Sequence, residues 1–342
     1  MKINIKDETI QTMCLAILTA IAVTGALHWL RPVMIPVVLA MMISLILTPA
    51  IDLQMKYLKS PRWLALGNTL IVGILLLLLM GLLFTVSFNH SMQNAEAYQD
   101  EIEKFLNRTS EWIKVQFGID FDGMIGPFIQ NLGRNTAGMV KTVLNAVLDI
   151  FSQGLLVAVF VIFLLLGKGR EHKPSKEWRE GEERVKRYVL VKLGISLVTG
   201  ALVWLTLIIL GVDLSLLFGF LAFVLNFIPT IGPVIATLLP LPVVLAQPEI
   251  PFWKGVLAIA IPGALQFFVG NILETKILGD VLDLHPVVVL MALIFWGMVW
   301  GIPGMFLAVP LTAVMQIIFS HFTFTAPLAA LLAGRLDEKQ VE

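Results

Sequence analysis

The chain has 342 residues, of which 58% are hydrophobic and 14% are charged, and its formal net charge at pH 7 is zero. Soluble domains carry about a quarter charged residues, so this composition, with a mean hydropathy of +0.88, indicates an integral membrane protein embedded in a lipid bilayer. A neutral chain gives no reason to expect a nucleic-acid partner. The single cysteine, Cys14, excludes an intrachain disulfide and a cysteine-based metal site.

The first apolar run begins at Ile10 and has some features of a secretory signal peptide. Ala20-Ile-Ala22 resembles a cleavage site. Asp7 and Glu8 interrupt the positive charge that a signal peptide needs, however, and a second apolar run follows at once from Val33. We therefore expect the first run to be retained as a membrane helix.

Long apolar runs predict an all-α, polytopic membrane protein with about six full transmembrane helices. Three runs lie within residues 1–88, a fourth within 142–166 and two more within 193–320. The predicted spans are Ile10–Leu30, Val33–Ile51, Trp63–Phe88, Val143–Leu166, Leu193–Leu210 and Phe252–Ile272.

Residues 89–141 form a polar segment between the third and fourth spans. Apolar residues such as Tyr98, Ile102 and Phe105 recur there at three- and four-residue spacing, with charged residues between them. This spacing predicts external amphipathic helices. We expect them to pack on one another or on a neighbouring subunit; the alternative is a vestibule that collects substrate.

The distribution of basic residues predicts the orientation of the chain. Residues 167–192 form a basic loop with nine Lys and Arg residues, whereas the segment 89–141 is rich in Asp and Glu. Cytoplasmic loops carry an excess of Lys and Arg. We therefore predict a multi-pass inner-membrane protein with a cytoplasmic N-terminus, basic loop and tail (residues 321–342). Binding of anionic lipid or a regulator is the alternative role of the basic loop.

Two apolar stretches in the C-terminal half, residues 193–320, are broken in the middle. Leu214–Ala246 is interrupted by Ile228-Pro-Thr-Ile-Gly-Pro233, and Pro286–Phe319 by Gly301-Ile-Pro-Gly304. Each half has about fifteen residues, and a helix of that length reaches only about 23 Å of the roughly 30 Å hydrocarbon core. Paired interruptions of this kind predict a transport site built from broken helices.

Two arrangements fit these lengths. We expect two re-entrant helical hairpins whose tips approach one another from opposite faces of the membrane and form the solute site. The alternative is that each broken segment crosses once as a kinked span, which gives eight spans. The division of labour we expect is a supporting N-terminal half and a transporting C-terminal half.

Proline lacks a backbone donor, so the breaks leave carbonyls and helix N-termini that can bind ions and solute. Glu274 is the strongest candidate for binding a coupling ion, Na⁺ or H⁺, with Lys276 as its partner. The alternative is that the span ends at Ile272 and Glu274 is an interfacial acid. The predicted substrate- or ion-binding residues are Asn226, Pro229, Gly232, Pro233, Gln266, Asn271, Glu274, Lys276, Pro303 and Gly304.

Patterns typical of enzymes are missing from the sequence. The five histidines are scattered without a zinc-binding HExxH spacing, and Gly167-Lys168 lacks the other residues of a phosphate-binding loop. We therefore expect no enzyme, no cofactor, no metal and no ATP-driven pump.

Several motifs in residues 190–320 resemble the autoinducer-2 exporter family, and the N-terminal half is similar to it in layout. These motifs are Asn226-Phe-Ile-Pro-Thr-Ile-Gly-Pro233, Gly270-Asn-Ile-Leu-Glu-Thr-Lys-Ile-Leu-Gly279, Leu284-His-Pro-Val-Val-Val-Leu290, Phe295-Trp-Gly-Met-Val-Trp-Gly301 and Gly304-Met-Phe-Leu-Ala-Val-Pro-Leu311. The resemblance implies export of the quorum-sensing signal autoinducer-2 or a related small polar molecule, and a homo-oligomer such as a pentamer. Monovalent cation (Na⁺)/proton antiport is the alternative that the family suggests. A non-transporting scaffold or regulator is the second alternative.

The chain departs from the family pattern, Asn-x-x-Glu-Pro-Arg/Lys, at one position. Thr275 stands where the family has proline, so the backbone there can donate a hydrogen bond and we expect a less sharp break after Glu274. Our mechanistic expectation is an ion-coupled carrier, elevator-like or hairpin-gated, in which the hairpins move against the first spans.

Overall fold

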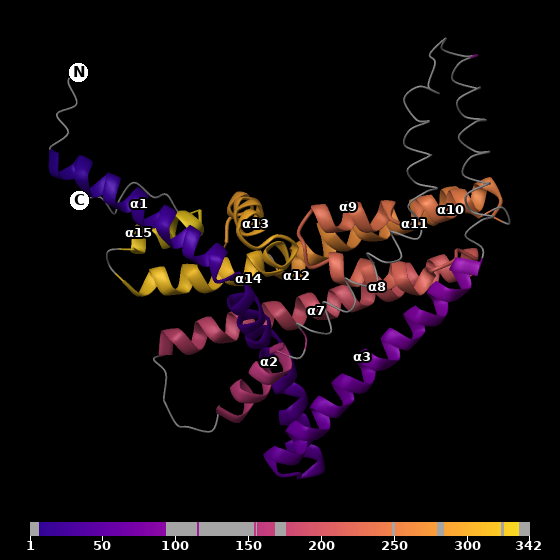
Figure 1. Ribbon diagram of the computed structural model, residues 1–342, viewed down its shortest axis with the longest axis horizontal. Coiled ribbons are helices and arrows are strands. Elements are labelled where there is room, and N and C mark those ends of the chain that lie inside the picture. Colours follow the sequence, from indigo (N-terminus) through magenta and orange to yellow (C-terminus); the bar gives the residue numbers. More distant parts are fainter. Residues whose placement is uncertain are drawn as a thin grey trace. The chain divides into compact units, whose positions relative to one another are not determined.

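The computed structural model describes residues 7–93, 115, 154, 156–167, 176–247, 250–278, 284–322 and 325–334. All regular secondary structure in these ranges is helical (Figure 1). The prediction of an all-α, polytopic membrane protein is therefore confirmed.

Five helical stretches of the described chain are long and apolar enough to cross a membrane. They are Ile10–Trp29, Arg31–Leu58, Arg179–Leu210, Phe252–Glu274 and Ile302–His321. Four of them overlap predicted spans. The fifth is one half of the second broken segment, as predicted, but the prediction that this half is too short to cross is wrong. With 20 residues, Ile302–His321 reaches about 30 Å as a helix.

The chain begins with three helices in close succession, α1 (Asp7–Trp29), α2 (Arg31–Leu58) and α3 (Arg62–Gln93). Pro32 occupies the first turn of α2, where a missing backbone N–H costs nothing. Of the predicted external helices, only residues 89–93, within α3, and residue 115 lie among the described residues. The predicted fourth span is described as a helix over Leu156–Gly167.

The second part of the predicted basic loop is helical. Helix α7 (Lys176–Leu210) runs for 35 residues and joins the basic segment to the predicted fifth span without interruption. Its buried residues recur at three- and four-residue spacing and include Tyr188, Lys192, Ser196, Thr199, Val203 and Leu207. Lys192 therefore belongs to the buried stripe of a helix and not to a loop.

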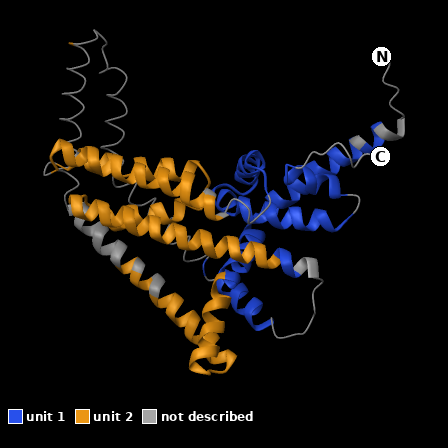
Figure 2. Ribbon diagram, turned by 180° about the vertical axis from the view of Figure 1, so that it is seen from behind, with its two compact units in different colours: residues 1–45, 153–181, 284–342 blue, residues 46–152, 182–283 orange. Residues whose placement is uncertain are grey.

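The chain forms two compact units (Figure 2). Unit 1 consists of residues 1–45, 153–181 and 284–342, and unit 2 of residues 46–152 and 182–283. Both units contain segments from before and after the basic segment, so they do not coincide with the predicted N-terminal and C-terminal halves. That the N-terminal half supports and the C-terminal half transports stays a prediction. The first broken segment belongs to unit 2 and the second to unit 1.

The first broken segment contains α8 (Ser215–Leu225), α9 (Ile231–Leu238) and α10 (Leu241–Ala246), and it doubles back on itself. Gln247, which follows α10, accepts a hydrogen bond from the Asp213 backbone N–H at 3.0 Å through its Oε1. Its Nε2 donates to the Gly211 carbonyl at 3.1 Å. The segment therefore ends beside its own start, as a hairpin does. Insertion of that hairpin into a bilayer from one face stays a prediction.

The core of unit 2 lies between α7, the first broken segment and α11 (Phe252–Phe268). Val203 and Leu207 of α7 cluster there with Ala222 of α8, Ala236 of α9 and Ala258 of α11. These small alanine side chains let the helices approach closely. Helix α11 continues into a π-helix, η1 (Val269–Glu274), and then into α12 (Thr275–Leu278).

Unit 1 contains the second broken segment, formed by α13 (Pro286–Trp300) and α14 (Ile302–His321), followed by α15 (Ala326–Leu332). Gly301 separates α13 from α14 with φ 69°, a backbone conformation that favours glycine. Trp296 Nε1 donates to Thr312 Oγ1, 16 positions further along the chain, at 3.3 Å, so the chain reverses here too.

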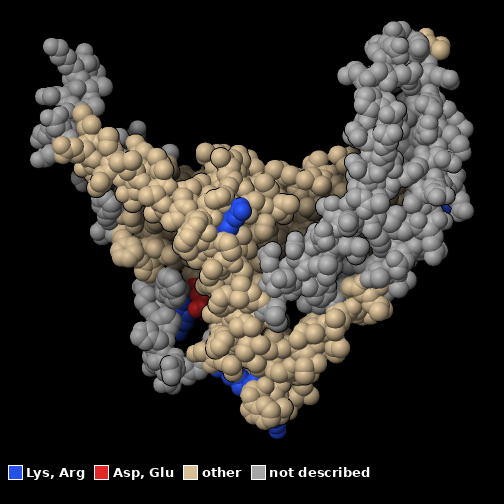
Figure 3. All heavy atoms as spheres, viewed as in Figure 1, with Lys and Arg blue, Asp and Glu red and all other residues tan. Residues whose placement is uncertain are grey.

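The surface of the described residues is strongly apolar. On the face drawn in Figure 3, the described residues are mostly uncharged, and Lys, Arg, Asp and Glu atoms emerge among them at only a few separate places. Large exposed apolar side chains include Leu15, Ile21, Ile74, Phe267 and Met298. Such a surface is what a lipid bilayer covers.

Candidate functional site

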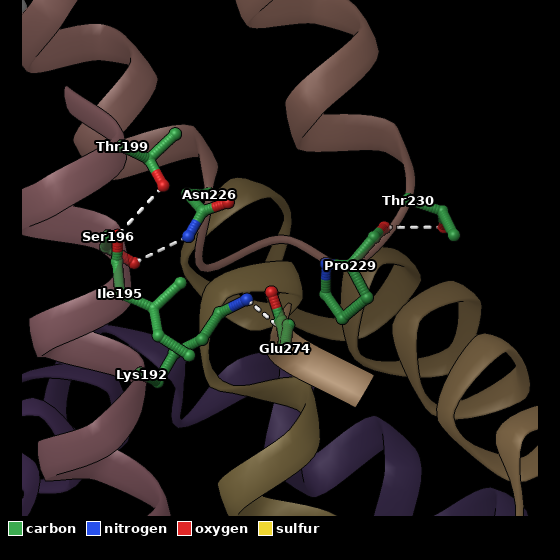
Figure 4. A network of polar contacts seen from close by, with 8 residues as sticks. All are labelled: Lys192, Ile195, Ser196, Thr199, Asn226, Pro229, Thr230 and Glu274. Atoms are coloured by element: carbon green, nitrogen blue, oxygen red, sulfur yellow. Dashed lines mark hydrogen bonds and ion pairs between the residues drawn. The ribbon is translucent and has the colours of Figure 1, made fainter. Parts of the chain in front are cut away.

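The charged centre of unit 2 is an ion pair between Lys192 of α7 and Glu274 at the end of η1. Lys192 Nζ donates to Glu274 Oε1 (Figure 4). The side chain of Lys192 is 2% exposed and that of Glu274 is 22% exposed. A buried charge is tolerated when an opposite charge and a hydrogen bond compensate for its lost water. Each of these two side chains therefore depends on the other.

A π-helix places Glu274 at this position. The π-turn from Val269 to Glu274 is a rare geometry that occurs mostly as short insertions in α-helices, frequently at functional sites. The chain then stays helical through Thr275 to Leu278, as we expected from the absence of proline after Glu274. Glu274 therefore lies within a continuous helix of unit 2.

A second polar contact lies one helical turn from the ion pair. Asn226, at the C-terminal end of α8, donates from Nδ2 to Ser196 Oγ of α7 at 2.9 Å, and both residues are buried. Figure 4 shows this contact on the same side of α7 as the Lys192–Glu274 pair. Unit 2 thus places a charged pair and a neutral pair next to each other inside apolar surroundings.

Two glycines bring α8 close enough to α7 for this contact. A Cβ on Gly200 of α7 would lie 2.7 Å from the Gly219 carbonyl oxygen of α8. A Cβ on Gly219 would lie 2.8 Å from the Gly200 carbonyl oxygen. Glycines facing each other in this way allow the backbones of membrane helices to touch. The close crossing holds the end of α8, with Asn226, against α7.

Gln266 of α11 is the third buried polar residue of unit 2. It is 3% exposed, and neither its Nε2 nor its Oε1 has a hydrogen-bond partner among the described residues. A buried amide without partners is unusual in native structures and calls for an explanation.

The predicted break residues shape the backbone of the first broken segment. The Pro229 carbonyl accepts hydrogen bonds from the Thr230 hydroxyl at 2.6 Å (Figure 4) and from the Ile231 backbone N–H at 2.6 Å, which together use both of its lone pairs. Gly232 packs against α8, and the Pro233 carbonyl accepts from Thr237 Oγ1 at 2.9 Å. The carbonyl and Cα atoms of these three residues are thus in contact with other parts of the same segment.

The other predicted site residues are not partners of the ion pair in the contacts of the described residues. Asn271 is exposed and its Nδ2 donates to the Phe267 carbonyl of its own helix at 3.0 Å. Lys276 is exposed, and the described partner of Glu274 is Lys192, so the predicted pairing with Lys276 is wrong. Pro303 and Gly304 lie at the start of α14, in unit 1.

Sequence reasoning missed Lys192 and Ser196 because both were assigned to a loop or to a plain span. A signal was nevertheless present. Lys192, Ser196 and Thr199 follow one another at spacings of four and three residues, which places them on one face of a helix. A polar stripe that continues into an apolar run of membrane-spanning length indicates a face turned toward protein and away from lipid.

Comparisons with known proteins cover both units. A sequence model of a family described as "AI-2E family transporter" matches residues 17–324. The "AI-2 transport protein TqsA" of Escherichia coli K12 is 28% identical over an alignment 313 residues long, which covers 88% of this chain and 89% of TqsA. The "Putative transport protein YhhT" of the same strain is 27% identical over an alignment 349 residues long, gaps included, which covers 95% of each chain. The "Putative transport protein YrrI" of Bacillus subtilis 168 is 29% identical over 328 residues, 86% of this chain and 88% of YrrI.

Proposed function

The chain belongs to the AI-2E transporter family, and we propose that it exports autoinducer-2 or a related small polar molecule by an ion-coupled mechanism. The solute is supported by the likeness to TqsA, whose name describes it as an AI-2 transport protein. The coupling is supported by one observation in the structure, the buried Lys192–Glu274 pair.

The physical argument for coupling rests on the cost of an unpaired buried charge. Ionisable residues within membrane spans are expensive and commonly mark ion or proton pathways. Binding of H⁺ or Na⁺ at Glu274 would cancel the negative charge that compensates Lys192. The protein would then favour a different arrangement of α7 and the helix that carries Glu274, and an ion gradient would drive the exchange between the two arrangements.

The first broken segment supplies a natural moving part for this mechanism. Asn226 ends α8 next to the ion pair, and the segment leaves and returns at the same place through Gln247. A change at the ion pair can therefore reach the break at residues 226–230 through α7. This arrangement supports an elevator-like or hairpin-gated carrier, in which the segment or the hairpins move as a body.

Flux measurements on the purified protein in proteoliposomes test this proposal. We expect autoinducer-2 to cross faster with an imposed proton or sodium gradient than without one. Glu274→Gln should keep downhill flux and lose the dependence on the gradient. The matched control is Glu183→Gln. Glu183 is an exposed carboxylate on α7, the helix that carries Lys192, and this variant should retain the dependence on the gradient. Gradient-driven flux that persists in Glu274→Gln would remove this residue from the coupling.

Monovalent cation/proton antiport is the second candidate, and the same ion pair favours it. An antiporter needs an ionisable site but no separate solute site. Addition of sodium to protein-containing vesicles, with no other solute present, would then release or take up protons in a manner that depends on Glu274. A proton flux that requires autoinducer-2 would instead favour the exporter.

We also propose an inner-membrane location, cytoplasmic termini and a homo-oligomeric assembly such as a pentamer. The basic residues that follow the second and fourth predicted spans support the orientation, and the family resemblance supports the assembly. Reporter fusions at the C-terminus test the orientation, and native mass spectrometry of the full chain tests the assembly.

A scaffold role would require that deletion of residues 89–141 abolishes cellular function while solute flux continues.

A further inference from the structure

We infer that Gln266 is the residue that recognises the transported solute, through a neutral hydrogen-bonding site that it forms with Asn226 and Ser196. This inference rests on the proposed export function and specifies its site. It starts from the buried amide of Gln266, which has no partner among the described residues at either its donor or its acceptor atom. Native proteins avoid such a group unless another molecule or a functional need accounts for it.

The position of Gln266 along its helix follows from two contacts that fix α11 against α7. Ala258 shares the core cluster with Val203 and Leu207 of α7, and Glu274 pairs with Lys192 at the other end. The two helices therefore run antiparallel. Gln266 lies eight residues after Ala258 and eight before Glu274. On α7, Ser196 and Thr199 lie about half-way between Lys192 and the core residues Val203 and Leu207.

Gln266 also faces the same way as these contacts. Ala258, Pro262 and Gln266 are the buried residues of α11, and they follow one another at four-residue spacing, which is one face of a helix. By this register, the inward face of α11 brings the amide of Gln266 near the level of α7 at which Asn226 bonds Ser196. We therefore assign these three neutral polar side chains, from α7, α8 and α11, to one layer of unit 2.

The chemistry of this layer defines the solute class. An amide side chain offers both donors and an acceptor but no charge, and a serine hydroxyl does the same. The two charges in the next turn, Lys192 and Glu274, compensate each other. While this pair is intact, a charged solute would therefore find no opposite charge here, at a large desolvation cost. We infer a small uncharged solute that carries hydroxyl and carbonyl groups.

The first broken segment controls access to the amide. A Cβ on Gly263, one turn before Gln266, would lie 3.3 Å from Cγ2 of Thr237, so α9 packs on α11 at this point. Helix α9 starts directly after the break that follows Asn226. Movement of the segment would uncover Gln266 and shift Asn226 at the same time, which couples solute binding to the conformational change.

Gln266→Leu tests the inference, with Gln11→Leu, an exposed glutamine of α1, as the matched control. The probe is autoinducer-2, added to the purified full-length protein for thermal unfolding and to proteoliposomes for flux. Without solute we expect Gln266→Leu to unfold at a higher temperature than the wild type, because it removes an unpaired buried amide. The concentration of autoinducer-2 that half-saturates both binding and flux should rise about tenfold. The gradient dependence should stay intact.

Competition distinguishes the solute class. Erythritol should reduce autoinducer-2 flux in the wild type more strongly than erythronate, which has the same carbon skeleton and a carboxylate. Equal or stronger competition by erythronate would overturn the neutral site. Unchanged half-saturation in Gln266→Leu, or a lower unfolding temperature, would show that Gln266 is structural and overturn the inference while gradient-driven export stands. Absence of autoinducer-2 binding and flux in the wild type would overturn the proposed function together with the inference.

Discussion

Gly232 lies against the carbonyl oxygen of Leu225, where a Cβ would approach that oxygen to 1.8 Å. Gly304 has the same relationship to Trp296, with a Cβ at 2.0 Å from the carbonyl oxygen. Each break therefore uses one device: the first turn of the second helix packs on the last turns of the first helix, at a place where only glycine fits. The two breaks share this device although they belong to different units.

Replacement of either glycine tests how much the close approach contributes. Gly232→Ala and Gly304→Ala should each lower the free energy of unfolding by about 1–3 kcal/mol or more, because backbone atoms have to move apart. Thermal unfolding of the protein in detergent measures the loss. Gly67→Ala, in α3 with nothing within 4 Å of its Cβ position, is the control and should be neutral or stabilising. Equal unfolding temperatures for all three variants would contradict the close packing.

The Lys192–Glu274 pair should show strong energetic coupling. Lys192→Met leaves the carboxylate of Glu274 without its cation, and removal of one partner of a buried pair costs about 3–5 kcal/mol. The double variant Lys192→Met/Glu274→Gln should be more stable than Lys192→Met, since it leaves no uncompensated charge. Unfolding in a denaturant series measures both values.

Lys276→Met is the control for the Lys192 and Glu274 variants. Lys276 is exposed and two residues from Glu274, and its loss should change stability by less than about 0.5 kcal/mol. A larger effect of Lys276→Met than of Lys192→Met would show that Lys276 is the true partner of the carboxylate.

Thr230 holds a strained backbone at the first break. Its φ of 59° and ψ of −52° are unfavourable for a β-branched residue, and glycine adopts positive φ without a steric penalty. Thr230→Gly should therefore raise the free energy of unfolding by about 1 kcal/mol. Thr206→Gly, which lies inside α7 near its C-terminal end, should lower it by a similar amount because glycine weakens a helix interior. The same sign for both variants would show that Thr230 is unstrained.

Two side chains fasten the end of α1 to the end of α13 within unit 1. Trp300 Nε1 donates to the Leu27 carbonyl at 3.0 Å, and His28 Nδ1 lies 2.8 Å from the Val299 carbonyl oxygen. Trp300→Phe keeps the ring but loses the donor, at a cost of about 1 kcal/mol. Hydrogen exchange of the last turns of α1 should accelerate severalfold in this variant. Trp253→Phe, at an exposed position of α11, should leave that exchange unchanged.

The sequence predicted those features that depend on neighbours along the chain. Apolar run lengths predicted the class and most of the spans, because a bilayer requires helices of a minimum length. The Pro and Gly clusters at residues 228–233 and 301–304 predicted both breaks, because proline removes a backbone donor and glycine permits conformations that other residues avoid. The length of α14 was misjudged because residues 302–304, which the sequence assigned to the break, form the first turn of this helix, with Pro303 in it, and the helix runs on to His321.

The partner of Glu274 was decided by tertiary structure alone. Lys276 is two residues away in sequence and Lys192 is 82 residues away, yet the structure pairs Glu274 with Lys192. Local rules reach about one helical turn, and within it side chains two residues apart on a helix point in different directions, so Lys276 is poorly placed to pair with Glu274. The actual partner depends on the π-turn before Glu274 and on how α7 and α11 pack around the core between Val203 and Ala258. The sequence thus singled out Glu274 as a charge within a membrane helix, whereas packing between distant helices buried Lys192 and made it the partner of Glu274.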